Sequence, residues 1–355
     1  MSVLFNPFRL RDVTLRNRIG VSPMCTYSAV DGRPNDWHLV HYGARATGGA
    51  GIVIAEATAI EPAGRISPHD CGLWDDGQVD AWRPISRFLS EHGAVPAVQI
   101  AHGGRKAGTA APWDGGKPLE DHEGGWEPVA PSPEPFRGHR TPRVLTESDL
   151  AVLRETWVSA AERARAAGFE VLEIHMAHGY LLHEFLSPLV NRREDDYGGD
   201  LENRMRFPLE VVAAVRSVWP EEFPLFVRIS ATDWTDDGWS VEDSVILARR
   251  LEGLGVDLVD CSSGGAVSCA PVPASPNYQV PFAARLRREA GIATAAVGLI
   301  REPAQAEAVV AEGSADLVLL GREFLREPHW PLHAAHELGA DASWPRQYLR
   351  GAPIC

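Results

Sequence analysis

Long apolar runs, positive charge and cysteine are all scarce in this sequence. The 355 residues include 48 Asp and Glu but only 34 Lys and Arg, which gives a net charge of −14 at pH 7. Because an acidic surface repels nucleic acid and anionic membranes, we expect neither as a partner. No stretch approaches the roughly 18 apolar residues that span a bilayer, and the N-terminus lacks a signal-peptide pattern. We therefore expect a soluble, cytoplasmic protein.

The five cysteines are an odd number and include no C-x-x-C pair. This usage predicts neither a disulfide framework nor a zinc or iron–sulfur site, so we expect no metal. No G-x-G-x-x-G follows a predicted strand, which argues against a Rossmann nucleotide-binding domain. The run Gly48-Gly49-Ala50-Gly51 precedes a strand and predicts the end of a helix instead.

Short apolar runs alternate with amphipathic stretches along the whole chain. The predicted strands cover residues 18–24, 51–60, 95–102, 169–176, 224–231, 256–264, 292–300 and 315–323. The predicted helices cover residues 36–47, 77–91, 150–167, 202–219, 241–254, 278–290, 303–312 and 328–338, and Thr146 and Ser240 begin plausible capping boxes. Eight strand–helix repeats predict a single parallel (β/α)8 barrel domain over residues 1–355, with a doubly wound open sheet as the alternative.

Two segments interrupt this alternation. Residues 103–145 are rich in Gly and Pro, contain Trp113 and Trp126, and have no helical period. Because they follow the third strand, we expect a lid or small subdomain over the active face of the barrel. Residues 343–355 lie beyond the last helix without a core to join, and we expect this tail to dock on a neighbouring subunit.

Polar side chains and glycines occupy most of the predicted carboxyl ends of the strands, where barrels place their catalytic residues. They are Ser22 to Tyr27, Glu56, Ala57, Gln99, His102, His175, His178, Tyr180, Arg228, Gly298, Gly321 and Arg322. In the loops after strands seven and eight, Gly298 and Gly321 let backbone N–H groups approach a phosphate, to which Arg322 can donate. A phosphorylated ligand is the prediction, and ordinary turn glycines with a surface arginine are the alternative.

His175, His178 and Tyr180 lie within six residues of one another at the end of the fourth strand. The two imidazoles could be metal ligands, although no third ligand stands at a motif spacing. They could instead donate hydrogen bonds to a substrate oxygen while Tyr180 donates a proton. A pair of purely structural histidines is the third interpretation, which the nearby tyrosine disfavours.

Six stretches resemble one known family in the same order along the chain. They are S-P-M-C-T-Y at Ser22, H-L-V-H-Y-G-A-R-A at His38, H-M-A-H-G-Y-L-L-H-E-F-L-S-P at His175, Y-G-G-D-L-E-N-R-M-R-F at Tyr197, D-C-S-S-G at Asp260 and G-R at Gly321. Together these motifs resemble the Old Yellow Enzymes, which are flavin-dependent ene-reductases, and within them the thermophilic-like branch that includes xenobiotic reductases.

The resemblance implies a non-covalent FMN across the barrel mouth, with its phosphate at Gly298, Gly321 and Arg322. Its ring would be lined by Ser22, Pro23, Met24, Cys25, Ala57 and Gln99. Arg228 would stabilise the negative charge of the reduced flavin. Cys25 stands where many relatives have threonine, and because a thiol is a weaker hydrogen-bond partner, we expect it to tune the flavin potential.

The resemblance also implies a ping-pong cycle in which NADPH or NADH reduces the flavin and an α,β-unsaturated carbonyl or nitro compound reoxidises it. His175 and His178 would bind the substrate oxygen, Tyr27 would be a second substrate contact, and Tyr180 would protonate the α-carbon. Arg350 resembles a tail arginine that reaches a neighbour's active site in a homodimer or homotetramer. A metal-dependent lyase or hydrolase and a non-enzymatic flavin-binding protein are the alternatives.

Overall fold

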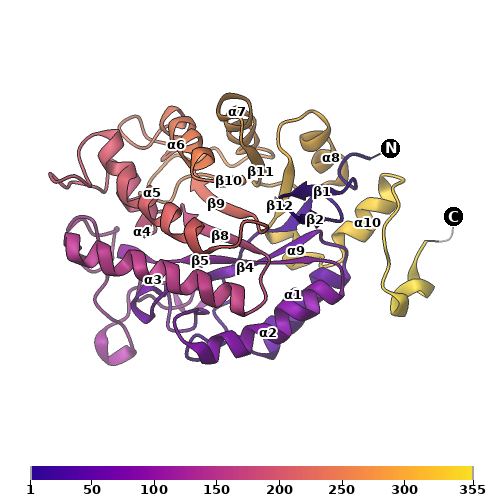
Figure 1. Cartoon of the computed structure of the whole chain (residues 1–355), viewed down its shortest axis with the longest axis horizontal. Coiled ribbons are helices and arrows are strands. Elements are labelled where there is room, and N and C mark those ends of the chain that lie inside the picture. Colours follow the sequence, from indigo (N-terminus) through magenta and orange to yellow (C-terminus); the bar gives the residue numbers. More distant parts are fainter. Residues whose placement is uncertain (1, 354–355) are drawn as a thin grey trace.

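A computed structural model of the chain contains a closed barrel of eight parallel strands surrounded by helices (Figure 1). The structure describes residues 2–353, so Met1 and residues 354–355, including Cys355 at the end of the predicted tail, lie outside it. The strands follow one another around the barrel in the order β10-β11-β12-β3-β4-β5-β8-β9. This arrangement confirms the predicted (β/α)8 barrel and rules out the open sheet.

Each predicted strand is present, although most are shorter than expected. They are β3 (Ile19–Val21), β4 (Ile52–Ala59), β5 (Val95–Ala101), β8 (Val171–Met176), β9 (Leu225–Ser230), β10 (Leu258–Ser262), β11 (Ala293–Ala296) and β12 (Leu317–Leu320). The helices predicted between them are α1 (Asp36–Thr47), α2 (Asp76–Glu91), α3 (Glu147–Ala166), α5 (Leu201–Val218), α6 (Val241–Gly253), α7 (Val280–Ala290), α8 (Pro303–Ala311) and α10 (Trp330–Glu337).

Local signals in the sequence set several helix boundaries. The Thr146 hydroxyl accepts a hydrogen bond from the Asp149 N–H, and Ser240 does the same for Asp243, so both capping boxes are confirmed. Helix α1 ends at Thr47 with Gly48 as its C-cap, as the glycine run predicts. These caps satisfy backbone groups that helix ends otherwise leave without partners.

The sequence patterns missed the shortest elements. A hairpin of β1 (Phe8–Leu10) and β2 (Val13–Leu15) precedes the barrel, and α4 (Leu181–Leu186) and α9 (Arg322–Arg326) follow β8 and β12. Val13 and Leu15 belong to the apolar cluster inside the barrel, together with residues near the start of the strands such as Ile52. The hairpin therefore closes the amino end of the barrel and leaves the carboxyl end for the polar side chains.

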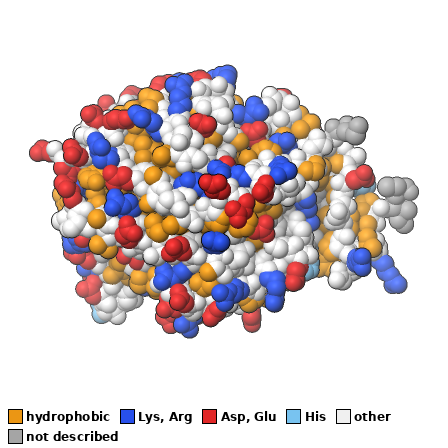
Figure 2. Space-filling model, in the orientation of Figure 1, with side chains coloured by type: hydrophobic (Ala, Val, Ile, Leu, Met, Phe, Trp, Pro, Cys, Tyr) orange, Lys and Arg blue, Asp and Glu red, His pale blue; other side chains and the backbone are white. Residues whose placement is uncertain are grey.

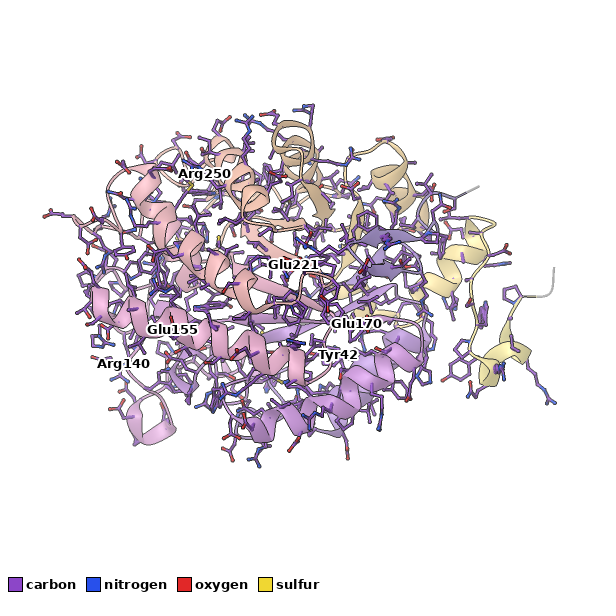
Figure 3. The ribbon with its side chains drawn as sticks, in the orientation of Figure 1. Tyr42, Arg140, Glu155, Glu170, Glu221 and Arg250 are labelled. Carbon is purple, nitrogen blue, oxygen red and sulfur yellow. The ribbon has the colours of Figure 1, made fainter. Side chains whose placement is uncertain are left out.

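Apolar side chains fill both the barrel interior and the space between strands and helices. Charged side chains of the outer helices face solvent, as Glu155 on α3 and Arg250 on α6 show in Figure 3. Figure 2 shows acidic and basic side chains intermixed over one face, with apolar ones scattered between them. Among the described residues, no helix is long and apolar enough to cross a membrane.

Residues 103–145 contain only short elements, as their composition predicts. These are η2 (Gly104–Lys106), η3 (Pro112–Asp114), η4 (Asp121–Glu123), β6 (Val129–Ala130) and β7 (Arg143–Val144). Beyond α10 the tail forms η5 (Arg346–Gly351), which lies at the edge of the molecule in Figure 1. Tyr348 of this tail packs on His329 with ring centroids 5.8 Å apart, and its partial exposure leaves room for a further contact.

The apolar cluster inside the barrel predicts how much a cavity at that place would destabilise the fold. Phe226 of β9 is fully buried inside the barrel, so Phe226→Ala should lower the free energy of unfolding by about 3–5 kcal/mol. Val152→Ala on the exposed face of α3 is the control and should change it by less than about 0.5 kcal/mol. Urea unfolding followed by circular dichroism measures both, and equal effects would contradict the packing described here.

Candidate active site

Two adjoining cavities open at the carboxyl ends of the strands. The larger, of about 320 Å³, is lined by Ser22, Pro23, Met24, Cys25, Tyr27, Ala57, Gln99, His175, His178, Tyr180, Arg228, Val297, Gly321 and Arg322. The smaller, of about 170 Å³, shares Arg228, Val297, Gly321 and Arg322 with it and adds Gly298, Arg301 and Arg326. The structure thus brings together every residue that the resemblance assigns to the flavin, its phosphate or the substrate, except Arg350, which lies in the tail.

Besides Thr26, two polar residues at the strand ends, Glu56 and His102, do not line either cavity. His102 Nε2 lies 2.9 Å from Glu61 Oε1, so this ring nitrogen is already hydrogen-bonded to a carboxyl group in the loop after β4. Glu56 accepts hydrogen bonds from the backbone N–H and the hydroxyl of Thr26. Both residues support the site from behind and do not face a ligand.

The imidazoles of His175 and His178 face the same space. His178 Nδ1 lies 3.4 Å from His175 Nε2, and the ring centroids are 5.1 Å apart at 87°. His175 Nδ1 accepts the backbone N–H of Ala177, so its Nε2 carries the proton and points toward His178. His178 Nε2 lies 2.7 Å from Ser262 Oγ, and when the serine donates there, Nδ1 becomes an N–H donor.

Burial keeps these groups uncharged. It lowers the pKa of His175 and of His178 well below the usual value, and the nearby Arg228 guanidinium lowers both further. Two neutral N–H donors fit a carbonyl or nitro oxygen. Among the described residues, no carboxylate or thiol joins the pair in a cluster of metal-binding geometry, so the metal-dependent alternative has no support.

Tyr180 lies edge-on to His175, with ring centroids 5.1 Å apart. Burial raises the pKa of its phenol, and the nearby Cys25 and Asp70 raise it further, so the hydroxyl keeps its proton at physiological pH. The backbone turn before it needs Gly179, which has φ +70°, because a Cβ there would lie 2.2 Å from the carbonyl oxygen of Gly265.

Lys106 is a site residue that the sequence patterns missed. Its Nζ donates hydrogen bonds to the carbonyl oxygens of His178 at 2.7 Å and Gly265 at 2.5 Å. It also lies 5.5 Å from the centroid of the Tyr180 ring. Burial lowers its pKa to about 8, with a further contribution from Arg105. The ammonium therefore ties the base of the 103–145 segment to the loop that carries His178 and Tyr180.

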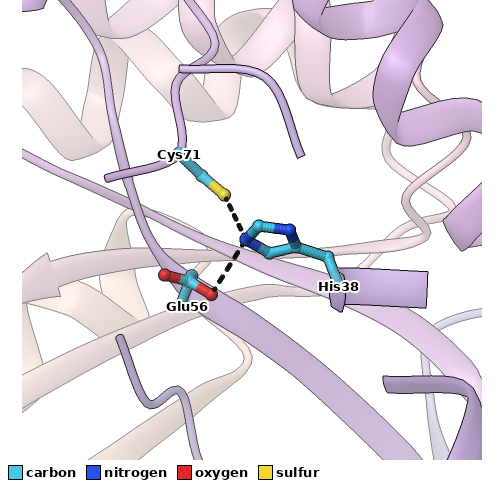
Figure 4. Close-up of side chains that lie close together, drawn as sticks. All are labelled: His38, Glu56 and Cys71. Atoms are coloured by element: carbon cyan, nitrogen blue, oxygen red, sulfur yellow. Dashed lines mark hydrogen bonds and ion pairs between the residues drawn. The ribbon is translucent and has the colours of Figure 1, made fainter. Parts of the chain in front are cut away.

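A buried cluster behind Cys25 anchors the first strand end. His38 Nε2 lies 3.3 Å from Cys71 Sγ and 3.6 Å from Glu56 Oε1 (Figure 4). The Glu56 carboxylate also accepts the hydroxyl of Tyr42, which is labelled in Figure 3. His38, Glu56 and Cys71 are residue types that bind metals, but the hydrogen bonds to Glu56 already engage its oxygens. We interpret the cluster as a hydrogen-bonded network that fixes Thr26, and with it the backbone next to Cys25.

The floor of the larger cavity contains a second buried network. Gln99 Nε2 donates to Glu173 Oε1 at 2.8 Å, and Arg228 Nε lies 2.9 Å from Asp260 Oδ2. Parallel pairing of the strands sets these neighbours, because Gln99 is in register with Glu173 and Arg228 with Asp260. A fixed guanidinium thus faces the cavity from below.

The smaller cavity has the chemistry of a phosphate site. Arg301, Arg322 and Arg326 line it within a chain of strongly negative net charge. A Cβ at Gly321 would meet only the Met24 sulfur at 3.6 Å, so the glycine leaves its backbone open to the cavity. With the apolar walls and the Gln99 and Arg228 donors of the larger cavity, these residues fit the phosphate and the ring system expected of FMN.

Three of the seven non-glycine residues with positive φ in the described part of the chain line these cavities. Tyr27, His178 and Leu299 have φ of 47°, 60° and 53°, values that residues with side chains rarely adopt. All three line a cavity, and such conformations cost about 1–3 kcal/mol each. The surrounding network, including the Lys106 contact with the His178 carbonyl, holds them in place.

Comparisons with known proteins point to one family. A sequence model of the NADH:flavin oxidoreductase / NADH oxidase family matches residues 3–341. The NADPH dehydrogenase of Geobacillus thermodenitrificans is 50% identical over 353 residues, which cover 99% of this chain and 98% of that protein. The NADPH dehydrogenase of Listeria monocytogenes serotype 4a is 46% identical over 353 residues, covering 99% of each.

Solved structures of two related enzymes have the same fold. Morphinone reductase in complex with tetrahydroNAD superimposes with a TM-score of 0.79 at 29% identity, covering 96% of this chain and 92% of that chain. The Old Yellow Enzyme homologue from Zymomonas mobilis gives a TM-score of 0.78 at 25% identity, covering 99% of both chains.

The lowered pKa values predict the protonation state of the paired imidazoles. Because the folded chain binds no proton on His175 or His178 while the unfolded chain does so below about pH 6.5, these residues favour unfolding as the pH falls through that value. Imidazole ¹⁵N chemical shifts should stay those of neutral rings from pH 8 to pH 5.5, with His178→Asn used for assignment. Titration of either ring in this range would contradict the proposed neutral donors.

Proposed function

Because the chain belongs to the NADH:flavin oxidoreductase / NADH oxidase family, it is an FMN-dependent oxidoreductase reduced by NAD(P)H, and we propose that it is an ene-reductase. The family match confirms the resemblance to the Old Yellow Enzymes. In this proposal the second substrate is an α,β-unsaturated carbonyl or nitro compound, whose activated C=C bond is reduced. The first substrate is the nicotinamide, which uses the same cavity in a ping-pong cycle.

One observation carries the proposal. A phenol that stays protonated lies edge-on to one of two neutral imidazoles, and all three line a single cavity. Reduction of a polarised alkene needs hydrogen bonds to its oxygen and a proton for its α-carbon, which these groups can supply. A protein that only stores flavin has no need for such a proton donor.

The cofactor would be held by residues of both cavities. FMN supplies the hydride when it is bound and reduced. We assign its ring to Ser22, Pro23, Met24, Cys25, Ala57, Gln99 and Arg228, and its phosphate to Gly298, Gly321 and Arg322. Burial and the nearby Asp70 and Glu56 carboxyls raise the pKa of the Cys25 thiol, so this residue stays a neutral neighbour of the ring and is not a nucleophile.

The histidines bind and polarise the substrate. His175 Nε2–H and His178 Nδ1–H would donate to the substrate oxygen and draw electron density from the C=C bond. The Ala177 N–H sets the tautomer of His175. In this proposal the Ser262 hydroxyl donates to His178 Nε2 at 2.7 Å and not to Gln279 Oε1 at 3.5 Å, so that both ring protons face the substrate oxygen. Because neither imidazole needs to change charge, the oxygen is held equally well over the neutral pH range.

Tyr180 then completes the reduction by giving its proton to the α-carbon. The phenolate that remains is stabilised by the nearby Lys106 ammonium, which lies 5.5 Å from the ring centroid. Trp113 of the 103–145 segment packs edge-on against Tyr27 at 5.6 Å, which supports a role for this segment as a lid that narrows the mouth of the cavity.

Removing the phenol hydroxyl tests this assignment. Tyr180→Phe should bind FMN and be reduced by NADPH at the wild-type rate, whereas its turnover of 2-cyclohexen-1-one should fall by roughly 10²–10⁴-fold because the proton donor is lost. Stopped-flow absorbance separates the two half-reactions. Tyr197→Phe, on a phenol remote from the cavity, is the matched control and should leave both unchanged. A wild-type oxidative rate in Tyr180→Phe would exclude the residue as the donor.

The exposed tail motivates a second test. We propose that Arg350 of η5 enters the active site of a neighbouring subunit in a homo-oligomer, since it lies outside both cavities of its own chain. Arg350→Ala should raise the KM for the enone roughly tenfold or more, the range of one lost hydrogen bond to a charged group, while FMN content stays unchanged. Arg346→Ala on the same short helix is the control. Equal kinetics for the wild type, Arg350→Ala and a chain ending at Ala342 would refute the role.

A further inference from the structure

Beneath the larger cavity, four adjacent strands each contribute one buried polar side chain. These are Gln99 of β5, Glu173 of β8, Arg228 of β9 and Asp260 of β10, each no more than 6% exposed. Gln99 and Arg228 also line the cavity, whereas Glu173 and Asp260 lie behind them. The two carboxyl groups therefore act on a ligand through Gln99 and Arg228, without touching it.

The charges of this group do not balance. Arg228 pairs with Asp260 at 2.9 Å, which leaves Glu173 without a cation of its own. Glu173 Oε1 accepts the Gln99 amide, but within residues 2–353 its Oε2 has no hydrogen-bond partner. Both Asp260 oxygens also lack a partner with hydrogen-bond geometry, so Asp260 is held by its ion pair with Arg228, whereas Glu173 has no ion pair. A buried carboxylate with an open oxygen is costly, and protonation removes that cost.

No other charged group compensates Glu173. On its own strand the next inward group is His175, which burial and Arg228 keep neutral. From the neighbouring strands only Gln99, Arg228 and Asp260 act on it. Burial and the Asp260 charge raise the pKa of Glu173 to about 8, and burial raises the pKa of Asp260 to about 6. A small change in local charge can therefore change the protonation of Glu173 near neutral pH.

Reduction of the cofactor is such a change. A hydride from NADPH brings two electrons and one proton to FMN and leaves NADP⁺, so the cavity gains one negative charge. Arg228 lines this cavity and would stabilise the added charge, but it already pairs with Asp260. We propose that Glu173 takes up one proton from solvent when FMN is reduced and returns it to solvent when the flavin is reoxidised. The proton cancels the added charge, and Gln99 and Arg228 transmit the coupling.

In this proposal Glu173 does not touch the flavin but changes the charge beneath it. A purely structural residue would not take up a proton on reduction. Hydride transfer alone consumes no proton from solvent, whereas coupled protonation consumes up to one per flavin. The count is expected to be largest above about pH 8, where Glu173 is ionised before reduction, and to fall as the pH is lowered through 8 to 7, because Glu173 is then already protonated before reduction. Proton uptake depends on FMN binding and not on which substrate reoxidises the flavin. The proposal for Glu173 can therefore hold even if the ene-reductase proposal fails.

The test counts protons during anaerobic reduction of the holoenzyme by one equivalent of NADPH, with a pH-indicator dye in weak buffer. At about pH 9, where Glu173 is mostly ionised before reduction, the wild type should take up most of one proton per flavin, and Glu173→Gln close to none. Glu184→Gln is the matched control, since Glu184 is also fully buried with one unpartnered oxygen and a pKa raised by burial to about 8, but it faces Arg105 and Lys106. This control should behave as the wild type does.

Infrared difference spectra identify the group that is protonated. A carboxylic-acid C=O band should appear on reduction of the wild type and of Glu184→Gln, and be absent from Glu173→Gln. Proton uptake that persists in Glu173→Gln would place the proton on the flavin or elsewhere and overturn the proposal. If Glu173→Gln does not bind FMN, the wild-type measurement alone tests the proposal. Absence of proton uptake by the wild type, or absence of a new carboxylic-acid band, would then refute the proposal.

Discussion

Removal of the strand-end side chains from water is the constraint on which the site depends. The same burial lowers the pKa of His175 and His178 and raises that of Tyr180 and Cys25, so each group is held in its uncharged, proton-bearing form. Arg228 remains the fixed cation facing the larger cavity from its floor. A set of neutral donors close to the Arg228 guanidinium is suited to a reaction in which negative charge appears first on the cofactor and then on the substrate.

The closed parallel barrel makes that burial possible. Strand register places His175 beside Arg228 and Arg228 beside Asp260, so the donor, the cation and its counter-ion come from three successive strands. Rigid strands fix the floor, whereas loops form the walls. Lys106 fixes one of these loops, because it joins the lid segment to the strained backbone at His178 and to Gly265.

Much of this could be predicted from the sequence, because the relevant signals are local. Apolar runs and amphipathic periods located the eight strands and the long helices, and the rule that barrels act at carboxyl strand ends located Tyr180, Gln99 and Gly321. The hairpin of β1 and β2 and the helices α4 and α9 are too short to show a period. Lys106 lacks any motif, and its importance comes from a fold that brings two distant carbonyl oxygens to its ammonium. The unbalanced charge around Glu173 could not be predicted from the sequence either, because it depends on the register of four strands.

The visible absorption spectrum of the purified protein, followed anaerobically as NADPH and then 2-cyclohexen-1-one are added, tests the central claim most directly. The account predicts a yellow flavin spectrum that bleaches with NADPH and returns with the enone. A flavin that bleaches and does not return with enone or nitroalkene would contradict the ene-reductase assignment, and a protein that cannot be loaded with FMN would contradict the interpretation of the two cavities.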